Sequence, residues 1–485
     1  MKVFSVILMS GLLLICNTFL LAQNNLDFDQ ALDIAREQSP LIKQARLNLE
    51  RSQQQLNAQQ AYLKSRFSLT LEPLYYDRQN KFNEYESSWY YSETKRSLGT
   101  FIVSQPMIWT DGTLTLRNEF SYTDFYNESS NDANKTYRNN LYLTFDQPFF
   151  TYNRTKLELK EIELDFENTA LDYKIQELQL EQQVAQAFYR VYQAKTAYQV
   201  SQEELKNTEN SYTIVKNKVD AGLTAMEELY QAELNLLNSQ STVENNRVSL
   251  ENYRDQLKKI LGLPIAEDID VITDVTLDTI RVDIDKALDY GLKSRMELRQ
   301  RDIDILYAWN NVIRAGATNE FRGDLSLRFG LTGINEQVED IFSRTDDNQS
   351  ISLSFNIPLY DWGEKKSRIK SAEATVEQRK ISMEEEQREI EISIRSAYRT
   401  ILNELNQVKI ARQNVKVAEL TYEINLEKYK NGDLTSMDLN LYQTQLSEKK
   451  LDLGNAIIAY RLAILDLKIQ SLWDFRKDKP VFGDL

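Results

Sequence analysis

The sequence has no histidine and a single cysteine, Cys16. These two residue types supply the imidazole bases, the thiol nucleophiles and many metal ligands of enzymes, and paired cysteines form disulfides. Catalysis without them would have to rely on carboxylates, as in glycosidases, and the sequence contains no paired-carboxylate constellation of that kind. We therefore expect a protein that is not an enzyme and that has no cofactor and no metal site.

Long apolar runs are missing after residue 22, so no later segment is expected to form a transmembrane helix. Residues 1–22 combine Lys2, an apolar stretch and the small residue Ala22, which is typical of a secretory signal peptide. A retained anchor is one alternative. A lipid on Cys16 is another, although Ile15 stands where lipidation needs a small residue. If the mature chain spans a membrane, it must do so as a β-barrel.

Basic residues are outnumbered by acidic ones. The 58 lysines and arginines stand against 73 aspartates and glutamates, which gives a net charge of −15. A surface of this sign is not attracted by charge to nucleic acid or to anionic lipid headgroups. We expect no nucleic-acid partner.

Proline is scarce: the chain has seven, and none lies within residues 149–263 or within 359–479. Long helices can occupy both stretches because proline is what would break them. Shorter helices are expected at about residues 27–66 and 283–322. Apolar residues recur every seven positions, which is the coiled-coil spacing, for example at Leu157, Leu164, Leu171 and Leu178. A plain helical bundle is the alternative.

One pattern occurs twice in the chain. LTFDQPFF at residues 143–150 returns as LSFNIPLY at 353–360, and Gly222 returns as Gly432, both at an offset of 210. Constant spacing is expected when the apolar face of a helix must stay in contact with its neighbour. One inserted residue would rotate the following part of that face by about 100° around the helix axis. An earlier match, LTL at residues 69–71 with LSL at 325–327, has an offset of 256. The first copy therefore carries 46 extra residues between the two matches.

Apolar and polar residues alternate in short stretches ahead of each long helix. Ile351, Leu353, Phe355 and Ile357 alternate with polar residues, and residues 141–146 and 325–331 show the same pattern. Strands of a membrane barrel alternate in this way, and so do strands of a soluble half-buried sheet. Aromatic clusters beside the strands, such as Trp89-Tyr90-Tyr91, favour a membrane interface. Because four strands cannot close a barrel, several chains would have to share one.

These patterns predict a mainly α protein with β-strands, made of two tandem repeats of long coiled-coil helical hairpins plus antiparallel strands of a shared transmembrane β-barrel. The first repeat is placed at residues 23–265, with strands within 67–147, a helical hairpin at 153–263 and a tip near residue 222. The second is placed at residues 266–485, with strands within 323–357, a hairpin at 363–472 and a tip near residue 432.

Short motifs mark the junctions and the tips. The strand-to-helix junctions read QPFF at residues 147–150 and PLYDWG at 358–363, so Pro148, Pro358 and Gly363 belong to them. LGLP separates the two copies, and AGLT and YKNGDLT contain the tips. Over essentially the whole mature length, the chain resembles the TolC-like outer-membrane factor family.

The resemblance implies the outer-membrane channel of a tripartite efflux or type I secretion system, a passive duct for cargo delivered by an inner-membrane pump. It implies a homotrimer in the outer-membrane lipid of a Gram-negative bacterium, with a twelve-stranded barrel, a large periplasmic portion and a periplasmic adaptor as partner. This sequence departs from the family's four strands per chain by added strands near residues 100–105 and 113–123. The added hairpin either enters the barrel or covers it.

Roles at the tips also follow from the resemblance. Glu228 and Asp438, six residues after each tip glycine, match positions where the family uses carboxylates to close its tunnel, and Tyr429 matches a tyrosine that helps to hold the gate shut. The alternatives are that both acids stabilise a first helical turn and that Tyr429 is a packing residue.

The tip turns themselves are expected at Gly222, Leu223, Gly432 and Leu434, which would dock the adaptor. Leu434 and Leu441 replace the family's gate arginine and its second acidic residue. The polar latch is therefore incomplete, and closure is expected to depend more on packing.

Two other functions share features with this pattern. A periplasmic adaptor also has long helical hairpins, but usually one, set in compact β-domains. A structural coiled-coil protein of the envelope would not need strands flanked by aromatic residues.

Overall fold

The computed structural model describes residues 24–130, 132–272 and 279–482. The predicted signal peptide, residues 1–22, and Cys16 lie outside the described residues. The chain divides into two compact units. Of the described residues, the helical unit takes 24–44, 176–272, 279–291 and 392–482, and the sheet unit takes 45–130, 132–175 and 292–391. Each unit takes segments from both predicted sequence repeats, because each of the two longest helices belongs partly to one unit and partly to the other.

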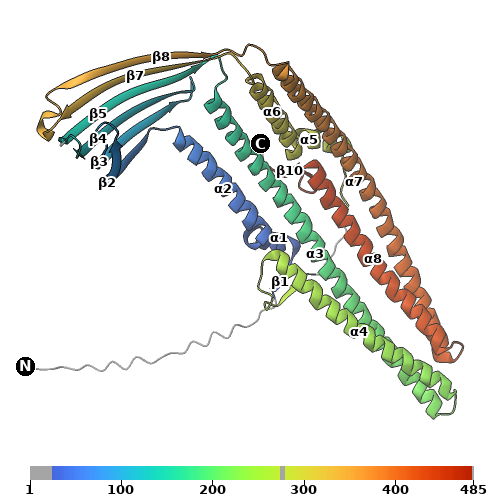
Figure 1. The fold of residues 1–485 in the computed structure, drawn as a ribbon. Coiled ribbons are helices and arrows are strands. Elements are labelled where there is room, and N and C mark those ends of the chain that lie inside the picture. Colours follow the sequence, from blue (N-terminus) through green and yellow to red (C-terminus); the bar gives the residue numbers. More distant parts are fainter. Residues whose placement is uncertain (1–23, 131, 273–278, 483–485) are drawn as a thin grey trace, which may run out of the picture. The chain divides into compact units, whose positions relative to one another are not determined.

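The two longest helices are α3 (Arg154–Asp220) and α7 (Glu364–Asn431), followed by α4 (Met226–Leu261) and α8 (Ser436–Ser471) (Figure 1). All four are free of proline in the sequence. The predicted fold class, long helical hairpins combined with antiparallel strands, is confirmed. No helix in the described part of the chain combines the length and the hydropathy that crossing a bilayer requires.

Both of the shorter helices that the sequence predicted are broken in two. Residues 27–66 form α1 (Phe28–Gln38) and α2 (Pro40–Tyr62), and residues 283–322 form α5 (Ile284–Ser294) and α6 (Met296–Gly316). Ser39 has ψ 132°, as expected for a residue that precedes proline and is pushed out of the helical region. Arg295, with ψ 125°, makes the corresponding break in the second copy. The prediction of continuous helices there was wrong.

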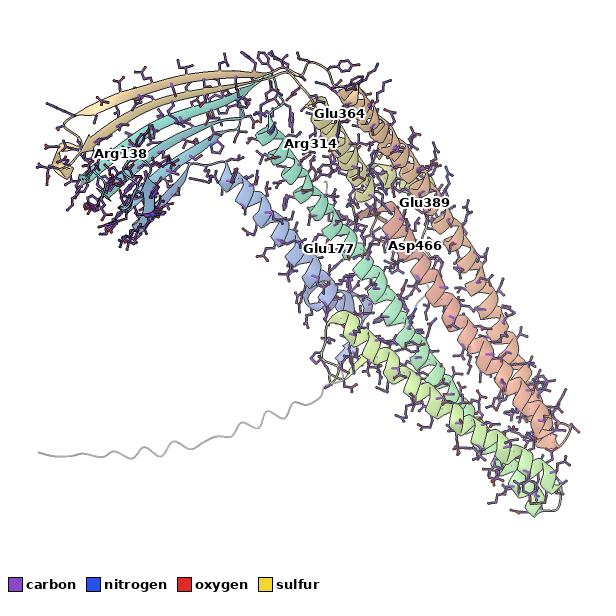
Figure 2. The ribbon with its side chains drawn as sticks, in the orientation of Figure 1. Arg138, Glu177, Arg314, Glu364, Glu389 and Asp466 are labelled. Atoms are coloured by element: carbon purple, nitrogen blue, oxygen red, sulfur yellow. The ribbon has the colours of Figure 1, made fainter. Side chains whose placement is uncertain are left out.

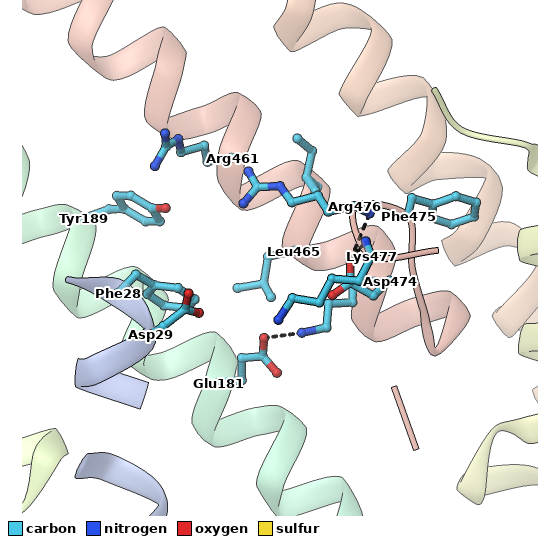
Figure 3. A pocket seen from close by; sticks show the side chains of 12 residues that line it. Phe28, Asp29, Glu181, Tyr189, Arg461, Leu465, Asp474, Phe475, Arg476 and Lys477 are labelled. Atoms are coloured by element: carbon cyan, nitrogen blue, oxygen red, sulfur yellow. Dashed lines mark hydrogen bonds and ion pairs between the residues drawn. The ribbon is translucent and has the colours of Figure 1, made fainter. Parts of the chain in front are cut away.

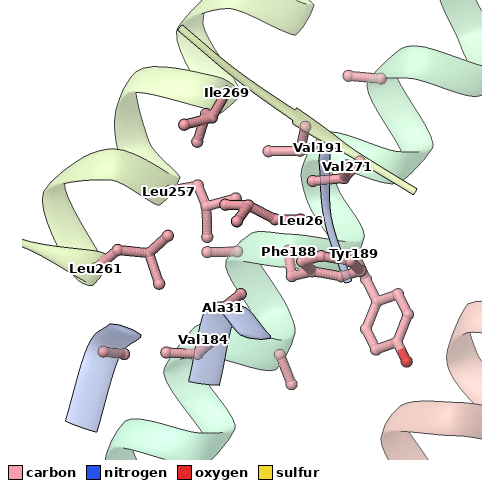
Figure 4. Close-up of a cluster of buried hydrophobic side chains, with 14 of the residues drawn as sticks. Leu26, Ala31, Val184, Phe188, Tyr189, Val191, Leu257, Leu261, Ile269 and Val271 are labelled. Carbon is pink, nitrogen blue, oxygen red and sulfur yellow. The ribbon is translucent and has the colours of Figure 1, made fainter. Parts of the chain in front are cut away.

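The core of the helical unit lies where α1, α3 and α4 meet a small parallel sheet of β1 (Asn24–Leu26) and β6 (Ile269–Val271) (Figure 4). Val184, Val191 and Leu257 are completely buried there. Phe28 packs edge-on against Phe188, with 5.9 Å between ring centroids. Burial of apolar side chains on this scale is the main source of stability for the unit.

A charged cluster borders this core at Asp270. Its carboxylate receives Lys195 Nζ at 2.5 Å and Arg254 Nη2 at 2.9 Å. Burial would raise the pKa of Asp270, but the hydrogen bonds from Lys195 and Arg254 outweigh it and lower that pKa. The cluster therefore ties the segment that follows α4 to α3 with a charge that stays ionised at neutral pH.

The sheet unit contains one six-stranded antiparallel sheet in the order β2-β3-β4-β5-β7-β8 (Figure 1). The strands are β2 (Arg66–Asn83), β3 (Ser88–Met107), β4 (Gly112–Asn127), β5 (Asp132–Phe149), β7 (Arg322–Asn335) and β8 (Thr345–Asn356). The added hairpin, β3 and β4, lies inside the sheet between β2 and β5. The sequence left open whether this hairpin enters the sheet or covers it, and in the structure it is part of the sheet.

In the same unit, α6 is attached to the adjoining segments of α3 and α7 by ion pairs. Arg299 Nε lies 2.6 Å from Glu167 Oε1, and Arg301 Nη2 lies 3.0 Å from Glu386 Oε2. Arg314, labelled in Figure 2, pairs with Glu161. These side chains are partly exposed, so each pair contributes little free energy. Their effect is to set how α6 lies along its neighbours.

Candidate functional site

Two tip turns join the long helices, and their backbones match. Gly222 has φ 72° and Gly432 has φ 92°, conformations that glycine adopts at little cost. Leu223 N donates to Lys218 O at 2.8 Å, and Asp433 N donates to Lys428 O at 3.0 Å. Both turns thus close the preceding helix with the same C-terminal hydrogen bond.

A small apolar cluster holds the two tips together. Val215, Ala232, Tyr429 and Leu439 are buried in it, and Leu434 packs against its edge. Each of the four long helices contributes one of the buried residues. Leu434 therefore adds apolar contact at a position where the resemblance implied that the family has an arginine.

Glu228 makes a specific contact with the other hairpin. Its Oε2 accepts hydrogen bonds from Ser436 Oγ at 2.7 Å and from Ser436 N at 3.3 Å. Ser436 is the first residue of α8, where free backbone N–H groups and the helix dipole favour an anion. Glu228 thus stabilises the start of α8 across the hairpins, while lying in the first turn of its own helix.

Lys218 was not identified from the sequence, yet it contacts the same cluster. Its Nζ donates to Tyr429 O at 3.0 Å and lies 5.1 Å from the centre of the Tyr429 ring. The Tyr429 carbonyl is at the C-terminal end of α7, where acceptors lack helix partners and a cation is favoured. The two residues are 211 positions apart, so no local sequence pattern could have paired them.

Tyr429 is a buried residue, with 3% of its surface exposed. Its hydroxyl lies 3.5 Å from Ser211 O, the long limit of a hydrogen bond. Burial, followed by the nearby charge of Glu228, raises the pKa of Tyr429 to about 12. Tyr429 thus contributes buried contact area to the tip cluster, and its hydroxyl makes at most a weak hydrogen bond.

Asp438 lies in the first turn of α8 and is exposed. Its Oδ2 accepts a hydrogen bond from Thr435 Oγ1 at 2.7 Å, and Thr435 Oγ1 accepts one from Asp438 N at 3.1 Å. Thr435 is therefore the N-cap of α8, and Asp438 is an acidic residue of its first turn.

The three predicted gate residues line one cavity of about 370 Å³ at the tips, which also takes in both tip turns. Its lining includes Lys218, Glu228, Tyr429, Leu434 and Asp438. Leu223 projects from the first turn with 77% of its surface exposed. Leu441, by contrast, is exposed and does not belong to this lining.

The predicted junction residues lie where the strands give way to helices. Pro148 is within β5, opposite Asp324, while Pro358 follows β8. Gly363 has φ 85° and precedes α7. Asp361 accepts hydrogen bonds from the Gly363 and Lys365 amides at 2.9 and 3.1 Å, and these bonds lower its pKa. Asp361 was not identified from the sequence; its carboxylate satisfies the free Lys365 amide in the first turn of α7.

A second cavity of about 130 Å³ lies elsewhere in the helical unit, near the end of α8 (Figure 3). Glu181 and Lys468 form an ion pair in its lining, with 2.6 Å between Lys468 Nζ and Glu181 Oε1. Glu181 is 5% exposed, so its charge is balanced mainly by this lysine.

Because the pKa of Tyr429 is raised, the free energy of unfolding of the tips should fall as the pH rises in the alkaline range. A folded-state pKa of about 12, above the usual value of about 10, means that the neutral form is favoured by folding. That stabilisation is complete below pH 10 and is lost as the pH rises through 12. We expect wild type to lose about 2 kcal/mol more than Tyr429→Phe between pH 9 and pH 11.5 in urea unfolding followed by helical circular dichroism. Tyr230→Phe, an exposed tyrosine on α4, serves as the control, and equal losses in all three proteins would refute the assignment.

Comparison with known proteins places the chain in a family. The model for the family described as "Outer membrane efflux protein" matches residues 113–263 and 298–467, more than half of the chain. The chain belongs to the outer membrane efflux protein family. The predicted resemblance, and with it the location in the outer membrane with a large periplasmic portion, is thereby confirmed.

Relatives within this family are distant in sequence. The cation efflux system protein CusC of Escherichia coli strain K12 is 22% identical over 294 residues, which are 59% of each chain. The chain thus spans less than two thirds of CusC. Outer membrane protein TolC of Salmonella enteritidis is 22% identical over 371 residues, 73% of each chain.

Solved structures show the same fold. The Campylobacter jejuni CmeC outer membrane channel superposes with a TM-score of 0.68 at 14% identity, covering 94% of this chain and 87% of CmeC. The open state of the Neisseria gonorrhoeae MtrE outer membrane channel superposes with a TM-score of 0.66 at 14% identity, covering 92% and 88%.

Proposed function

We propose that this outer membrane efflux family member is the outer-membrane channel of a tripartite efflux or type I secretion system. It would act as a passive exit duct across the periplasm for cargo delivered by an inner-membrane pump, with a periplasmic adaptor docked at its tips. The observation that carries the proposal is the combination of an amphipathic sheet with paired helical hairpins whose tips enclose a cavity lined by charged and aromatic residues. Family membership and the CmeC-like fold support it.

A homotrimer is part of this proposal. The sheet does not close on itself, because β2 and β8 lie at its two ends and are not paired with each other. Open edges facing lipid are costly, so other copies must complete the wall. In a trimer, each tip cavity would face its symmetry mates around one axis.

The adaptor is proposed to dock on the exposed apolar side chains at the tips. Leu223 and Met437 are 77% and 71% exposed, and Met226 is 49% exposed. Gly222 and Gly432 provide the turns that present them. Leu434 is partly buried against the tip cluster, so we propose that it serves closure more than docking.

We also infer that the chain is built from two tandem repeats, residues 23–265 and 266–485, behind a signal peptide at residues 1–22. The element lengths support this division. α3 has 67 residues and α7 has 68, while α4 and α8 have 36 each. Helices that differ in length by at most one residue place the two tip turns at matching positions along their hairpins, because the rise per helical residue is constant at about 1.5 Å.

Asp438 is the residue proposed to form the charged constriction, because it is exposed whereas Glu228 is engaged with Ser436. Three copies would form a ring of like charge that attracts divalent cations. We expect Asp438→Asn to weaken block by divalent cations at least about tenfold in single-channel recordings from planar bilayers. Glu427→Gln, which removes an exposed charge paired with Lys430 on α7, should leave block unchanged.

Two results would count against these assignments. If divalent block of Asp438→Asn equals that of wild type, Asp438 does not line the constriction, although the protein can still be a channel. If the purified protein forms no channels in bilayers and fractionates as a soluble periplasmic protein, the adaptor or the structural coiled-coil function replaces the channel.

A further inference from the structure

The added hairpin is integrated into the sheet over its full length. β3 pairs with β4 from Ser92 to Met107, and β4 pairs with β5 from Thr113 to Asn127. On the other side, β3 pairs with β2 from its start at Ser88, with one irregularity near Glu72. In the second repeat, β7 and β8 are direct neighbours, whereas the matching β2 and β5 are separated by the hairpin.

One face of the sheet is mainly apolar on all six strands. Residues directly opposite in antiparallel strands share a face, and the registers Phe67–Val103–Leu116–Leu143–Phe329 follow one another across five strands. The apolar residues on this face are Phe67, Leu69 and Leu71 on β2, Phe101 and Val103 on β3, Leu114, Leu116 and Phe120 on β4, Leu141, Leu143 and Phe145 on β5, Leu325, Leu327, Phe329 and Leu331 on β7, and Ile351, Leu353 and Phe355 on β8.

The opposite face is mainly polar. A row on it runs through Thr115, Thr144, Arg328 and Ser350. A membrane barrel places apolar side chains toward lipid and polar ones toward the lumen. The inserted strands β3 and β4 therefore carry the same two-faced pattern as the four strands that match between the repeats.

The register also shows how the strands are inclined. Arg66, the first residue of β2, is level across the sheet with Ser350, which lies six residues before the end of β8 at Asn356. Six residues span roughly 20 Å along a strand, and five strand spacings span roughly 24 Å. If the helix-side strand ends form a level rim, the tilt is about 40°, within the range of closed barrels.

The two outer strands expose their free edges. Every residue of β8 is exposed, and nearly every residue of β2 is. β2 starts from the helix side of the sheet, after α2, and β8 returns to it before α7. A β8 placed beside the β2 of another copy would thus continue the antiparallel alternation without a break.

From these observations we infer that β2 of each copy pairs with β8 of the next, and that all six strands of every copy belong to the wall. This inference rests on the trimer of the proposed function. Three copies of six strands then make an eighteen-stranded barrel. Barrel diameter grows roughly in proportion to strand number, so the pore in the membrane is about 1.5 times as wide as that of the twelve-stranded barrel implied by four strands per chain.

Cysteine crosslinking tests the seam between copies. The mature chain has no cysteine of its own if residues 1–22 are removed. Leu353→Cys on β8 is combined in turn with Phe67→Cys, Leu69→Cys and Leu71→Cys on β2, and a short bismaleimide is added to the protein in membranes. We expect at least one pair to yield a covalently closed ring of three chains. The matched control combines Leu353→Cys with Leu143→Cys, which lies on the interior strand β5. This pair should give no crosslink between chains.

Fluorescence quenching tests whether the hairpin lies in the wall. A bimane label on Leu116→Cys, from the apolar face of β4, should be quenched by brominated lipid at least about twofold more strongly than one on Thr115→Cys, from the polar face. Both positions are in the inserted hairpin and next to each other in the chain, so they share any general disturbance of folding.

The outcomes of these experiments test the eighteen-stranded wall, the trimer and the proposed channel separately. A trimer without any β2–β8 crosslink, or equal quenching at residues 115 and 116, overturns the eighteen-stranded wall and leaves the proposed channel intact. A crosslinked ring of two chains overturns the trimer itself, because two copies of six strands would close a twelve-stranded barrel.

Discussion

Replacement of Gly262 by alanine should lower the free energy of unfolding of the helical unit by about 3 kcal/mol or more. Gly262 ends α4 with φ 80° and donates its N–H to Lys258 O. A left-handed conformation costs a non-glycine residue about 1–2 kcal/mol. In addition, a Cβ at this position would lie 2.3 Å from Gln38 O and 2.7 Å from Gln38 C. Those are backbone atoms at the break between α1 and α2, and they cannot move away by a side-chain rotation.

Gly222→Ala is the matched control for this substitution. Gly222 has φ 72°, but no atom lies within 4 Å of the position that its Cβ would take. The control therefore has the backbone cost alone, about 1–2 kcal/mol. Both variants are compared with wild type by urea unfolding of detergent-solubilised protein, followed by circular dichroism at the helix band. If both substitutions lower the free energy of unfolding equally, the backbone at Gln38 moves away from the new methyl group at little cost.

Lys468→Met should destabilise the helical unit by about 3–5 kcal/mol. Lys468 Nζ lies 2.6 Å from Glu181 Oε1, and Glu181 is only 5% exposed (Figure 3). Without the lysine, a carboxylate would remain in a site that water reaches poorly, and an unpaired buried charge is far more costly than a broken surface pair. The methionine keeps most of the volume of the lysine stem, so the loss of packing is small.

Two further variants separate charge from packing at this site. Glu181→Gln combined with Lys468→Met removes both charges and should recover more than half of the lost stability. Lys450→Met breaks an ion pair with Glu203, whose side chain is 56% exposed, and should cost at most about 1 kcal/mol. If the double variant is as unstable as Lys468→Met alone, the loss comes from packing and not from the stranded carboxylate. All four proteins are measured by the same unfolding experiment.

The long helices were predictable because their signals are local. Proline is absent from α3, α4, α7 and α8, and the glycines that end the first helix of each pair, Gly222 and Gly432, are visible in the sequence. The break before Pro40 also has a local signal, since proline disfavours a helical conformation in the residue before it. The break at Arg295 carries no comparable signal.

The contacts at the tips were only partly predictable. Glu228, Tyr429 and Asp438 were expected there, and they line one cavity. Which groups they contact was not foreseen: Glu228 binds Ser436, 208 residues away, and Lys218 binds the carbonyl of Tyr429. Such pairs depend on how two hairpins pack, and that is set by the apolar cluster of Val215, Ala232 and Leu439 and not by the polar residues themselves.

The sequence by itself determined the element types, the duplication pattern and the family, because periodicity, the positions of proline and glycine, and short junction motifs act over a few residues or recur at a constant spacing. Only the tertiary structure decided that β3 and β4 enter the sheet and that both of its outer edges are open. Alternating strands look alike whether they pair inside a sheet or cover it. Their placement is decided by hydrogen bonds to strands distant in the chain, which leave no local mark on the sequence.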